Sequence, residues 1–324
     1  MERRCKHPDC YVPETSCVMG NRDASTCEFW GGSKDIQSDD PPPAAQSVDT
    51  TMVPWSGGSM GLSDLAFVAA RGTPTVVGVI GAHDAGKTTF LAALFLLMLR
   101  HGNTKKNTFA GSCSLLGWEQ LASHLRWSGS EPPRFPPHTA AFERRSPGLL
   151  HLAFRTDSGV LRDLLFVDAP GEWFRQWAFD RDASGAEGAR WVAAHSDLFL
   201  VFADCAALAG DNRGESRVIT RQILQRVVTE RRNRPLMLIW SKCDVEIAPH
   251  MRESVQELLQ GITPLSEVAL SVKPLPPKDE VAEHRFLDLL DGVLSLPMSR
   301  DADVTLPTTT TRDFFLEFRG EGNV

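Results

Sequence analysis

Short apolar runs alternate with amphipathic stretches over most of the chain, from about residue 61 to residue 300. The runs are rich in Val, Leu, Ile and Phe and contain few polar positions. Unbroken runs of this kind are typical of buried strands in a parallel sheet, because helices cover both faces of such a sheet. We expect strands at 75–81, 149–154, 163–169, 198–204, 235–241 and 268–272.

The stretches between these runs show the helical spacing of apolar positions, which places one face of each helix against a sheet. We expect helices at 87–100, 186–195, 214–232, 250–260 and 284–295. Strands that alternate with helices favour an α/β fold, with a mostly parallel sheet and helices on both of its faces. The pattern therefore predicts an α/β domain over residues 61–300.

The two ends of the chain lack this alternation. Residues 1–35 are rich in cysteine and poor in aliphatic residues, whereas residues 36–60 are rich in Pro, Ser, Gly and Asp. The second composition is typical of a flexible linker that its prolines stiffen in part. The tail at 301–324 contains TTTTRDFFLEF, which suits an added edge strand as well as a docking peptide.

Net charge and hydropathy limit the classes of partner and the locations that we expect for this chain. The 324 residues carry a net charge of −7, which disfavours a nucleic-acid binder that relies on a broad basic face. The longest apolar run, at 90–99, is about half as long as a membrane-spanning helix. The N-terminus lacks the apolar core of a signal peptide. We therefore expect a cytoplasmic protein without a membrane segment, whose seven cysteines form no structural disulfides.

The segment GAHDAGKTT at Gly81–Thr89 fits the phosphate-loop pattern G-x-x-x-x-G-K-S/T, and it lies between an expected strand and an expected helix. Glycines allow the tight turn that points backbone N–H groups at phosphate oxygens. Lys87 is expected to bridge the β- and γ-phosphates of a nucleotide, and Thr88 to bind Mg²⁺. The predicted phosphate contacts are Gly81, Asp84, Ala85, Gly86, Lys87, Thr88 and Thr89.

A second motif, VDAPGE, begins inside the expected strand at 163–169. Asp168 stands at the carboxyl end of that strand, where ligand sites of α/β proteins collect, and it is a candidate Mg²⁺ ligand. The backbone N–H of Gly171 is expected to contact the γ-phosphate. Glu172 follows, and it is either the general base or a bystander that leaves the water to His83 or to a partner's residue.

A third motif, WSKCD, ends the expected strand at 235–241. The Asp244 carboxylate suits the N1–H and 2-amino donors of guanine, which adenine lacks in that place, and the stem of Lys242 is expected to cover the base. After the last expected strand, SVK is expected to bring a backbone N–H to the guanine O6. The predicted base contacts are Ser241, Lys242, Asp244, Ser271, Val272 and Lys273.

With these motifs in this order, residues 73–300 resemble the translation-factor-related class of P-loop GTPases, which includes Ras. The cysteine-rich head, the linker and the DAPGE turn resemble the bacterial double-GTPase family, whose members are inferred to act with companion proteins in multi-gene conflict or defence systems. The resemblance implies a Ras-like P-loop domain that binds GTP or GDP with Mg²⁺ and hydrolyses GTP slowly. It also implies signalling to protein partners through the switch regions, with a homo- or hetero-oligomer left open.

The chain departs from this class at the phosphate loop and at the base motif. Ser241 replaces the usual Asn before Lys-x-Asp and cannot supply its amide, while His83 and Asp84 stand where Ras-like proteins have glycines. These departures keep two alternatives open. One is a nucleotide-binding scaffold without turnover, and the other is an ATP-dependent small-molecule kinase, against which Asp244 argues.

GTPases of this class carry a threonine for Mg²⁺ and the γ-phosphate in a segment called switch I. No motif in this chain marks that threonine. We choose Thr139 in PPHTAAF, because it approaches the second expected strand after a proline-rich turn. The alternatives are Thr104 and Thr108. Together with the earlier motifs, this choice gives the predicted catalytic residues Lys87, Glu172 and Thr139.

Four cysteines lie within the first 27 residues, at Cys5, Cys10, Cys17 and Cys27. Four thiolates complete a tetrahedral Zn²⁺ site, and a segment so short and so poor in apolar residues gains its fold from metal binding. We favour this zinc-binding head over a tail with free thiols.

Five aromatic residues follow Gly171: Trp173, Phe174, Trp177, Phe179 and Trp191. They suit either a partner-binding surface or the core of the domain, and we favour the core.

Overall fold

The computed structural model of the chain describes residues 4–5, 21, 23–32, 57–126, 134–136, 147–263, 265–272 and 280–296. It divides into two compact units, Met1–Pro54 and Trp55–Val324. None of the helices in these ranges is long and apolar enough to cross a membrane.

The first unit contains a short antiparallel pair, β1 (Arg4–Cys5) with β2 (Trp30–Gly32), and a 3-10 helix, η1 (Ala24–Thr26). The Asp23 carboxylate caps η1 by accepting the Ser25 N–H at 2.9 Å, and the Ser25 hydroxyl, which donates to it at 2.7 Å, together with this N–H lowers the pKa of Asp23. Within the described residues, no three His, Cys, Asp or Glu side chains are grouped so that they could hold a metal ion.

The predicted zinc site is therefore not supported by the residues that the structure describes. Cys27 is a free thiol there. Cys10 and Cys17 lie outside the described residues, and for Cys5 the structure describes the backbone alone.

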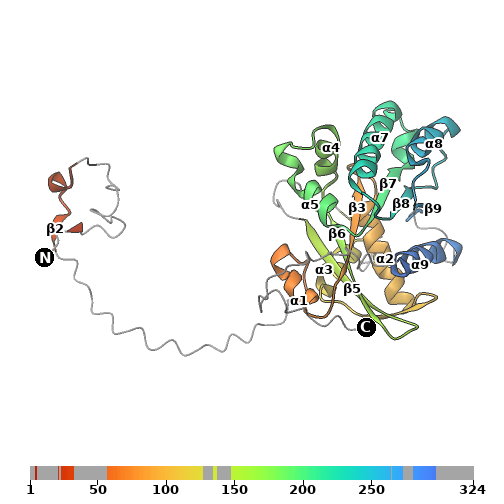
Figure 1. Cartoon of the computed structure of the whole chain (residues 1–324), viewed down its shortest axis with the longest axis horizontal. Helices are drawn as coiled ribbons and strands as arrows, with labels where there is room; N and C mark the ends of the chain where they lie inside the picture. The colour runs from red at the N-terminus through yellow and green to blue at the C-terminus, as the bar shows by residue number, and fades with distance from the viewer. Residues whose placement is uncertain are drawn as a thin grey trace, which may run out of the picture. The chain divides into compact units, whose positions relative to one another are not determined.

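The second unit is built on a seven-stranded sheet (Figure 1). The strands are β3 (Thr75–Gly81), β4 (Asn107–Gly111), β5 (Gly148–Thr156), β6 (Leu161–Asp168), β7 (Leu198–Asp204), β8 (Leu236–Ser241) and β9 (Leu265–Ala269). Their order in the sheet is β4-β5-β6-β3-β7-β8-β9. From β6 to β9 all neighbours are parallel, while β5 runs antiparallel to β6 and β4 antiparallel to β5. The predicted α/β fold with a mostly parallel sheet is confirmed.

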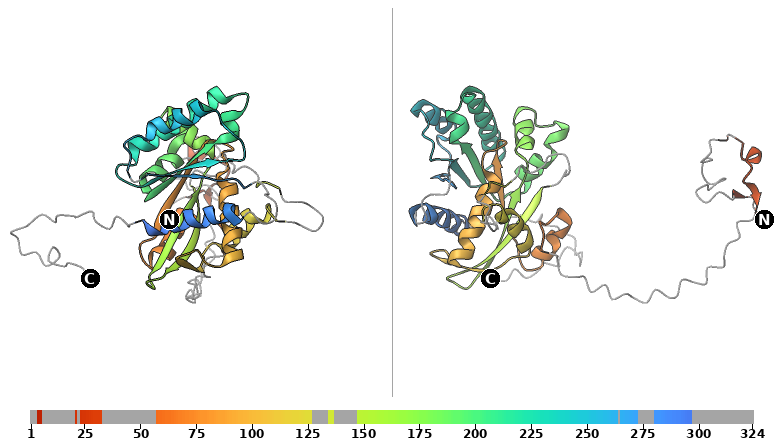
Figure 2. Two further views of the ribbon diagram at one scale, coloured as in Figure 1. Left: turned by 90° about the vertical axis from the view of Figure 1, so that its right-hand side faces the viewer. Right: turned by 180° about the vertical axis from the view of Figure 1, so that it is seen from behind.

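Helices cover both faces of this sheet, as predicted. They are α1 (Leu65–Ala69), α2 (Lys87–His101), α3 (Leu115–Ser123), α4 (Gly171–Phe179), α5 (Glu187–His195), α6 (Cys205–Ala209), α7 (Arg213–Glu230), α8 (Pro249–Gln256) and α9 (Glu280–Ser295). Three 3-10 helices join them: η2 (Leu62–Asp64), η3 (Ser184–Ala186) and η4 (Glu257–Leu259). The orange helix α2 and the blue helix α9 lie side by side (Figure 2).

Two hydrophobic clusters form the core, one on each face of the sheet. In the central strand, Ile80 belongs to the cluster beneath α4, α5, α7 and α8, whereas Val77 and Val79 belong to the cluster beneath α2, α3 and α9. Alternate side chains of a strand point to opposite faces, so an unbroken apolar run feeds both clusters. This is why the central strands were predictable from hydrophobicity.

The strand expected at 268–272 is displaced by three residues, because β9 begins at Leu265 and ends at Ala269. Pairing with β8 fixes this position, with Leu236 opposite Leu265 and Trp240 opposite Ala269. The strand lies at the sheet edge, where Ser266 and Glu267 face solvent and interrupt the apolar run. The other edge strand, β4, was not predicted at all, because its exposed positions are polar or small.

A buried polar group ties the antiparallel side of the sheet together. His151 in β5 is fully buried; its Nε2 lies 2.8 Å from Oδ1 of Asp163 in β6, and its Nδ1 accepts the Cys113 N–H at 2.8 Å. Because Nδ1 accepts, the ring proton is assigned to Nε2 and is donated to Asp163. Arg71, just after α1, approaches the same carboxylate at 3.4 Å. Burial lowers the pKa of His151.

This lowered pKa predicts that the protein loses stability in mild acid. The unfolded chain binds a proton at His151 near pH 6.5, whereas the folded chain binds it only at a lower pH, so the free energy of unfolding falls below about pH 6.5 by up to about 1.4 kcal/mol per pH unit. Urea unfolding between pH 7.5 and pH 5 would measure this slope. The slope should decrease in His151→Gln, which does not titrate, and persist in His250→Gln, which changes an exposed histidine of α8. Equal slopes in both variants would contradict the assignment.

Candidate functional site

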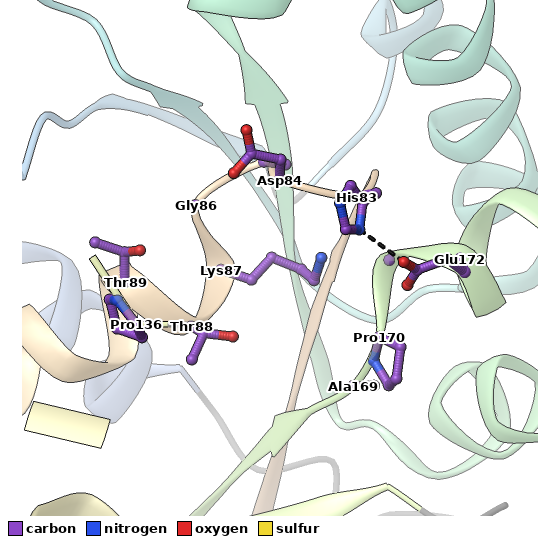
Figure 3. A pocket seen from close by; sticks show the side chains of 12 residues that line it. His83, Asp84, Gly86, Lys87, Thr88, Thr89, Pro136, Ala169, Pro170 and Glu172 are labelled. Carbon is purple, nitrogen blue, oxygen red and sulfur yellow. Dashed lines mark ion pairs between the residues drawn. The ribbon is translucent and has the colours of Figure 1, made fainter. Parts of the chain in front are cut away.

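The site lies at the carboxyl edge of the parallel strands, where β6, β3, β7 and β8 end next to one another. Ligand sites of α/β folds collect at this edge because the loops that follow parallel strands converge there. The loop after β3 is the predicted phosphate loop, and it leads into α2. A small pocket beside it is lined by residues 83–89, Pro136 and residues 169–172 (Figure 3).

The phosphate loop takes the turn that its sequence predicts. Asp84 and Gly86 adopt left-handed backbone conformations, with φ of 58° and 83°. Gly86 is the N-cap of α2, so the first turn of that helix begins at the pocket. The side chains of His83 and Asp84 line the pocket and are held by neighbours, since His83 pairs with Glu172 and Asp84 reaches Lys242.

Lys87 is buried at the start of α2. Its ammonium group donates to the Gly81 carbonyl at 3.2 Å and to the Ala82 carbonyl at 2.9 Å. Burial lowers the pKa of Lys87 to about 8, although the carboxylates of Asp168 and Glu172 act in the opposite direction. Both carbonyl acceptors belong to the loop itself, so the cation is held beside the pocket by the backbone that would also bind phosphate.

Thr88, which lines the pocket, contacts Asp168 at the end of β6. The Thr88 hydroxyl donates to Asp168 Oδ1 at 3.1 Å, which brings a neutral and an anionic oxygen to one place. Oxygen ligands of this kind suit Mg²⁺, which takes few protein ligands and keeps water or phosphate on the others. The two residues therefore fit the magnesium ligands that the sequence predicts.

The helix α4 begins directly against the phosphate loop. A Cβ atom at Gly171 would collide with the backbone nitrogen of His83 and with the carbonyl carbon of Ala82, so a glycine is required there. Pro170 is the N-cap of α4, which leaves the first N–H groups of that helix at the pocket. Two helix N-termini thus face one small space, and anions are stabilised at such ends.

On the base side of the site, Lys242 is held by two carboxylates. It adopts a left-handed backbone conformation with φ of 53°, and its ammonium group lies 2.8 Å from Asp204 Oδ2 and 3.5 Å from Asp84 Oδ2. The same Asp204 caps α6 by accepting the Ala207 N–H at 3.1 Å. Ser241 is buried and donates to the Ala203 carbonyl at 3.4 Å.

Asp204 was not among the predicted site residues. Its signal in the sequence is an acidic residue at the end of the apolar run LFLVFAD, the same signal that singled out Asp168. Through its contact with Lys242, Asp204 connects the end of β7 to the WSKCD motif.

The loops after β8 and β9 are also joined. The Ser271 hydroxyl donates to Asp244 Oδ1 at 2.6 Å, and the Cys243 N–H donates to the Leu270 carbonyl at 3.1 Å. A backbone N–H of this segment is predicted to meet the base, and the hydroxyl of Ser271 has a further role in holding Asp244. Lys273 lies outside the described residues.

A cavity of about 620 Å³ opens between these loops. Its polar rim includes Lys242, Asp244 and Ser271, and it has an apolar wall formed by Phe90, Phe135, Phe202 and Phe286. A planar aromatic ring with polar edges fits such a lining. The cavity shares four lining residues with the phosphate pocket, namely Asp84, Gly86, Thr89 and Pro136. Phe135 and Phe286 were not predicted, because no motif marks them.

The candidates for the switch-I threonine divide by position. Thr139 lies outside the described residues, although Pro136 nearby lines both cavities. Thr104 is buried at the far end of α2, where its hydroxyl pairs with Asp291 of α9, and Thr108 lies in β4 opposite Arg155. Neither alternative lines either cavity.

The aromatic residues after Gly171 belong mainly to the core, as we favoured. Phe174 and Trp177 are fully buried, and Trp173 packs against Gly188 of α5. Phe179 is the exception, with more than half of its surface exposed. The first two turns of α4 are therefore anchored to the domain by packing.

Two comparisons bear on this site. The model of a protein family described as Double-GTPase 2 matches residues 75–294, which is more than half of the chain and includes both cavities. No curated protein matches the chain.

The contact of Asp204 with Lys242 predicts an effect on nucleotide binding. Asp204→Ser keeps a side chain that can cap α6 but loses the ion pair, so we expect the dissociation constant for GDP to rise about fivefold, equivalent to roughly 1 kcal/mol. Calorimetry would measure it. Asp157→Ser changes an exposed aspartate of a distant turn and should leave affinity unchanged. A change below about twofold in Asp204→Ser would show that Lys242 needs no anchor.

Proposed function

Because this chain belongs to the Double-GTPase 2 family, we propose that it is a GTP-binding switch that selects guanine, hydrolyses GTP slowly with Mg²⁺ and signals to protein partners. The observation that carries the proposal is Asp244, whose carboxylate is held by Ser271 at the rim of the larger cavity. A carboxylate accepts the N1–H and 2-amino donors of guanine and has no such partners on adenine.

The phosphate end of the nucleotide is proposed to bind in the smaller pocket. Lys87 would bind the β- and γ-phosphates, Thr88 and Asp168 would hold Mg²⁺, and the N–H of Gly171 would bind the γ-phosphate. The metal would supply charge neutralisation between the phosphate oxygens. The four shared lining residues support one ligand that extends through both cavities.

Slow hydrolysis is supported by the charges at the phosphate pocket. Among the described residues that line it, there is no arginine, and Lys87 is its lysine. An arginine finger contributes about 10³–10⁵ to the rate in related reactions, and intrinsic rates without one are on the order of 10⁻³ s⁻¹ or below. Thr139 is our choice for the threonine that completes the site.

The partners are proposed to contact the two segments that flank the phosphate pocket. Phe135 and Phe179 are each more than half exposed, and exposed aromatic residues favour protein contacts. A cytoplasmic location and a role in a bacterial conflict or defence system rest on composition and on the resemblance of the head, the linker and the DAPGE turn.

The head is proposed to bind Zn²⁺ through Cys5, Cys10, Cys17 and Cys27. The support is the number and the spacing of thiols in a segment with few apolar residues.

Guanine selectivity is the test of the proposed function. GTP and GDP should bind at least about tenfold more tightly than ATP, a difference of roughly 1.4 kcal/mol, and Asp244→Asn should abolish the preference because an amide oxygen accepts less strongly and its NH₂ opposes the guanine donors. Calorimetry with the three nucleotides measures both. Glu246→Gln, an exposed neighbour, serves as the control. Equal affinity of the wild-type protein for ATP would refute guanine selectivity.

The zinc proposal has its own measurement. Metal analysis of protein purified without chelators should give about one zinc per chain. Replacing Cys10 and Cys17 together by Ser should remove the zinc and leave GDP affinity unchanged, whereas Cys113→Ser, in the second unit, should retain it. Zinc that persists in the double variant would place the metal elsewhere.

A further inference from the structure

His83 and Glu172 face each other beside the phosphate pocket. The Nδ1 atom of His83 lies 2.7 Å from Oε1 of Glu172, and both side chains line the pocket (Figure 3). His83 belongs to the phosphate loop and Glu172 to the first turn of α4. The pair therefore joins the two segments whose backbone N–H groups face the phosphates.

The backbone fixes this pairing. Gly171 packs so closely on Ala82 and His83 that an added Cβ would collide with their backbone atoms. The residues that carry the two side chains are consequently held next to each other, and α4 is anchored behind them by the fully buried Phe174 and Trp177. The positions of His83 and Glu172 in this ion pair are thus set by the packing of their backbones.

The second oxygen of Glu172 is the informative one. Oε2 is shielded from solvent and has no hydrogen-bond partner among the residues that the structure describes. A buried charged acceptor without a partner costs more than about 1–3 kcal/mol, so such an atom is expected to meet a ligand. Because Glu172 lines the phosphate pocket, a ligand that enters the pocket meets this carboxylate.

A carboxylate at this place has two shortcomings. It has no hydrogen to donate to the phosphoryl group, and its charge repels that group by roughly 1–4 kcal/mol at about 4 Å. His83 compensates for both, because an imidazole ring supplies an N–H donor and its cationic form offsets the charge. Lys87 adds to this compensation, since Glu172 acts on its pKa through their electrostatic attraction.

We propose that Glu172 and His83 act as one catalytic pair on the hydrolytic water, and the proposal rests on the GTPase function proposed above. The Glu172 carboxylate accepts a hydrogen bond from the water, and His83 in its cationic form donates from Nδ1 to Glu172 and from Nε2 to an oxygen of the γ-phosphoryl group. As the water oxygen bonds to the γ-phosphorus, the bond to the β–γ bridging oxygen breaks and its electron pair leaves with GDP. The water proton passes to an oxygen of the γ-phosphoryl group as phosphate forms, and Glu172 remains the hydrogen-bond acceptor of the water without taking its proton.

This division of labour predicts a pattern that a merely structural ion pair would not give. A glutamine combines an acceptor and a donor in one side chain, so Glu172→Gln needs no help from His83. In single-turnover hydrolysis of GTP, Glu172→Ala should lower the rate by roughly 10²-fold and His83→Ala by about tenfold. Glu172→Gln should stay within about threefold of wild type, and His83→Ala should cost less than about threefold in that background.

Binding of a transition-state mimic gives a readout that does not depend on turnover. Calorimetry should show that Glu172→Ala and His83→Ala weaken the binding of aluminium fluoride to the GDP–Mg²⁺ complex by about tenfold, while GDP affinity changes by less than about twofold. His101→Ala is the matched control, because His101 forms a similar pair with Glu283 at 3.0 Å between α2 and α9. It should leave both measurements unchanged.

The outcomes separate the two proposals. Wild-type protein that binds neither GDP nor GTP would overturn the proposed function itself. Normal GDP binding together with unchanged hydrolysis in Glu172→Ala and His83→Ala would overturn the catalytic pair alone. A loss of rate in Glu172→Gln as large as in Glu172→Ala would also overturn it, because a side chain that both accepts and donates would then not replace the pair.

Discussion

The contact of two backbones, Gly171 against Ala82 and His83, sets the geometry on which the rest of the site depends. It is too close for any Cβ atom, so it brings the start of α4 against the phosphate loop at a fixed separation. The parallel pairing of β3 with β6 makes this contact possible, because both strands end at the same edge and their following loops meet there. Two helix N-termini, one lysine and the His83–Glu172 pair are thereby arranged around one pocket.

Acidic side chains shape this site as much as the basic ones do. Lys242 lies between Asp204 and Asp84, Lys87 interacts with Asp168 and Glu172, and Glu172 pairs with His83. Opposite charges therefore alternate from the cavity of about 620 Å³ to the phosphate pocket, and Asp84 lines both. In a chain with a net charge of −7, this alternation lets a strongly anionic ligand meet cations and N–H groups rather than unopposed carboxylates.

The parts of the fold and the site that were predictable depend on local signals. The phosphate loop was found because a glycine turn stands between an apolar strand and an amphipathic helix, and Asp168 because it ends such a strand. What was missed depends on contacts between distant segments. The edge strands β4 and β9 are defined by their pairing, and Phe286 reaches the base cavity only because α9 packs beside α2. The closeness of His83 to Glu172 likewise follows from the packing of Gly171 and leaves no trace in either local sequence.

The alternating charges also determine how substitutions in this site combine. Each member is shared: Asp204 both caps α6 and holds Lys242, and Glu172 both pairs with His83 and acts on Lys87. Removal of one member leaves a charged neighbour unpaired at reduced solvent exposure, so part of the measured effect comes from the group that remains. Effects of two neighbouring substitutions should therefore not add, and a double-mutant cycle, rather than a sum of single losses, is what assigns a role to each residue. Shared contacts also hold the segment after β8: Lys242 is positioned by Asp84 and Asp204, and Asp244 by Ser271, so neither contact involves an amide at position 241.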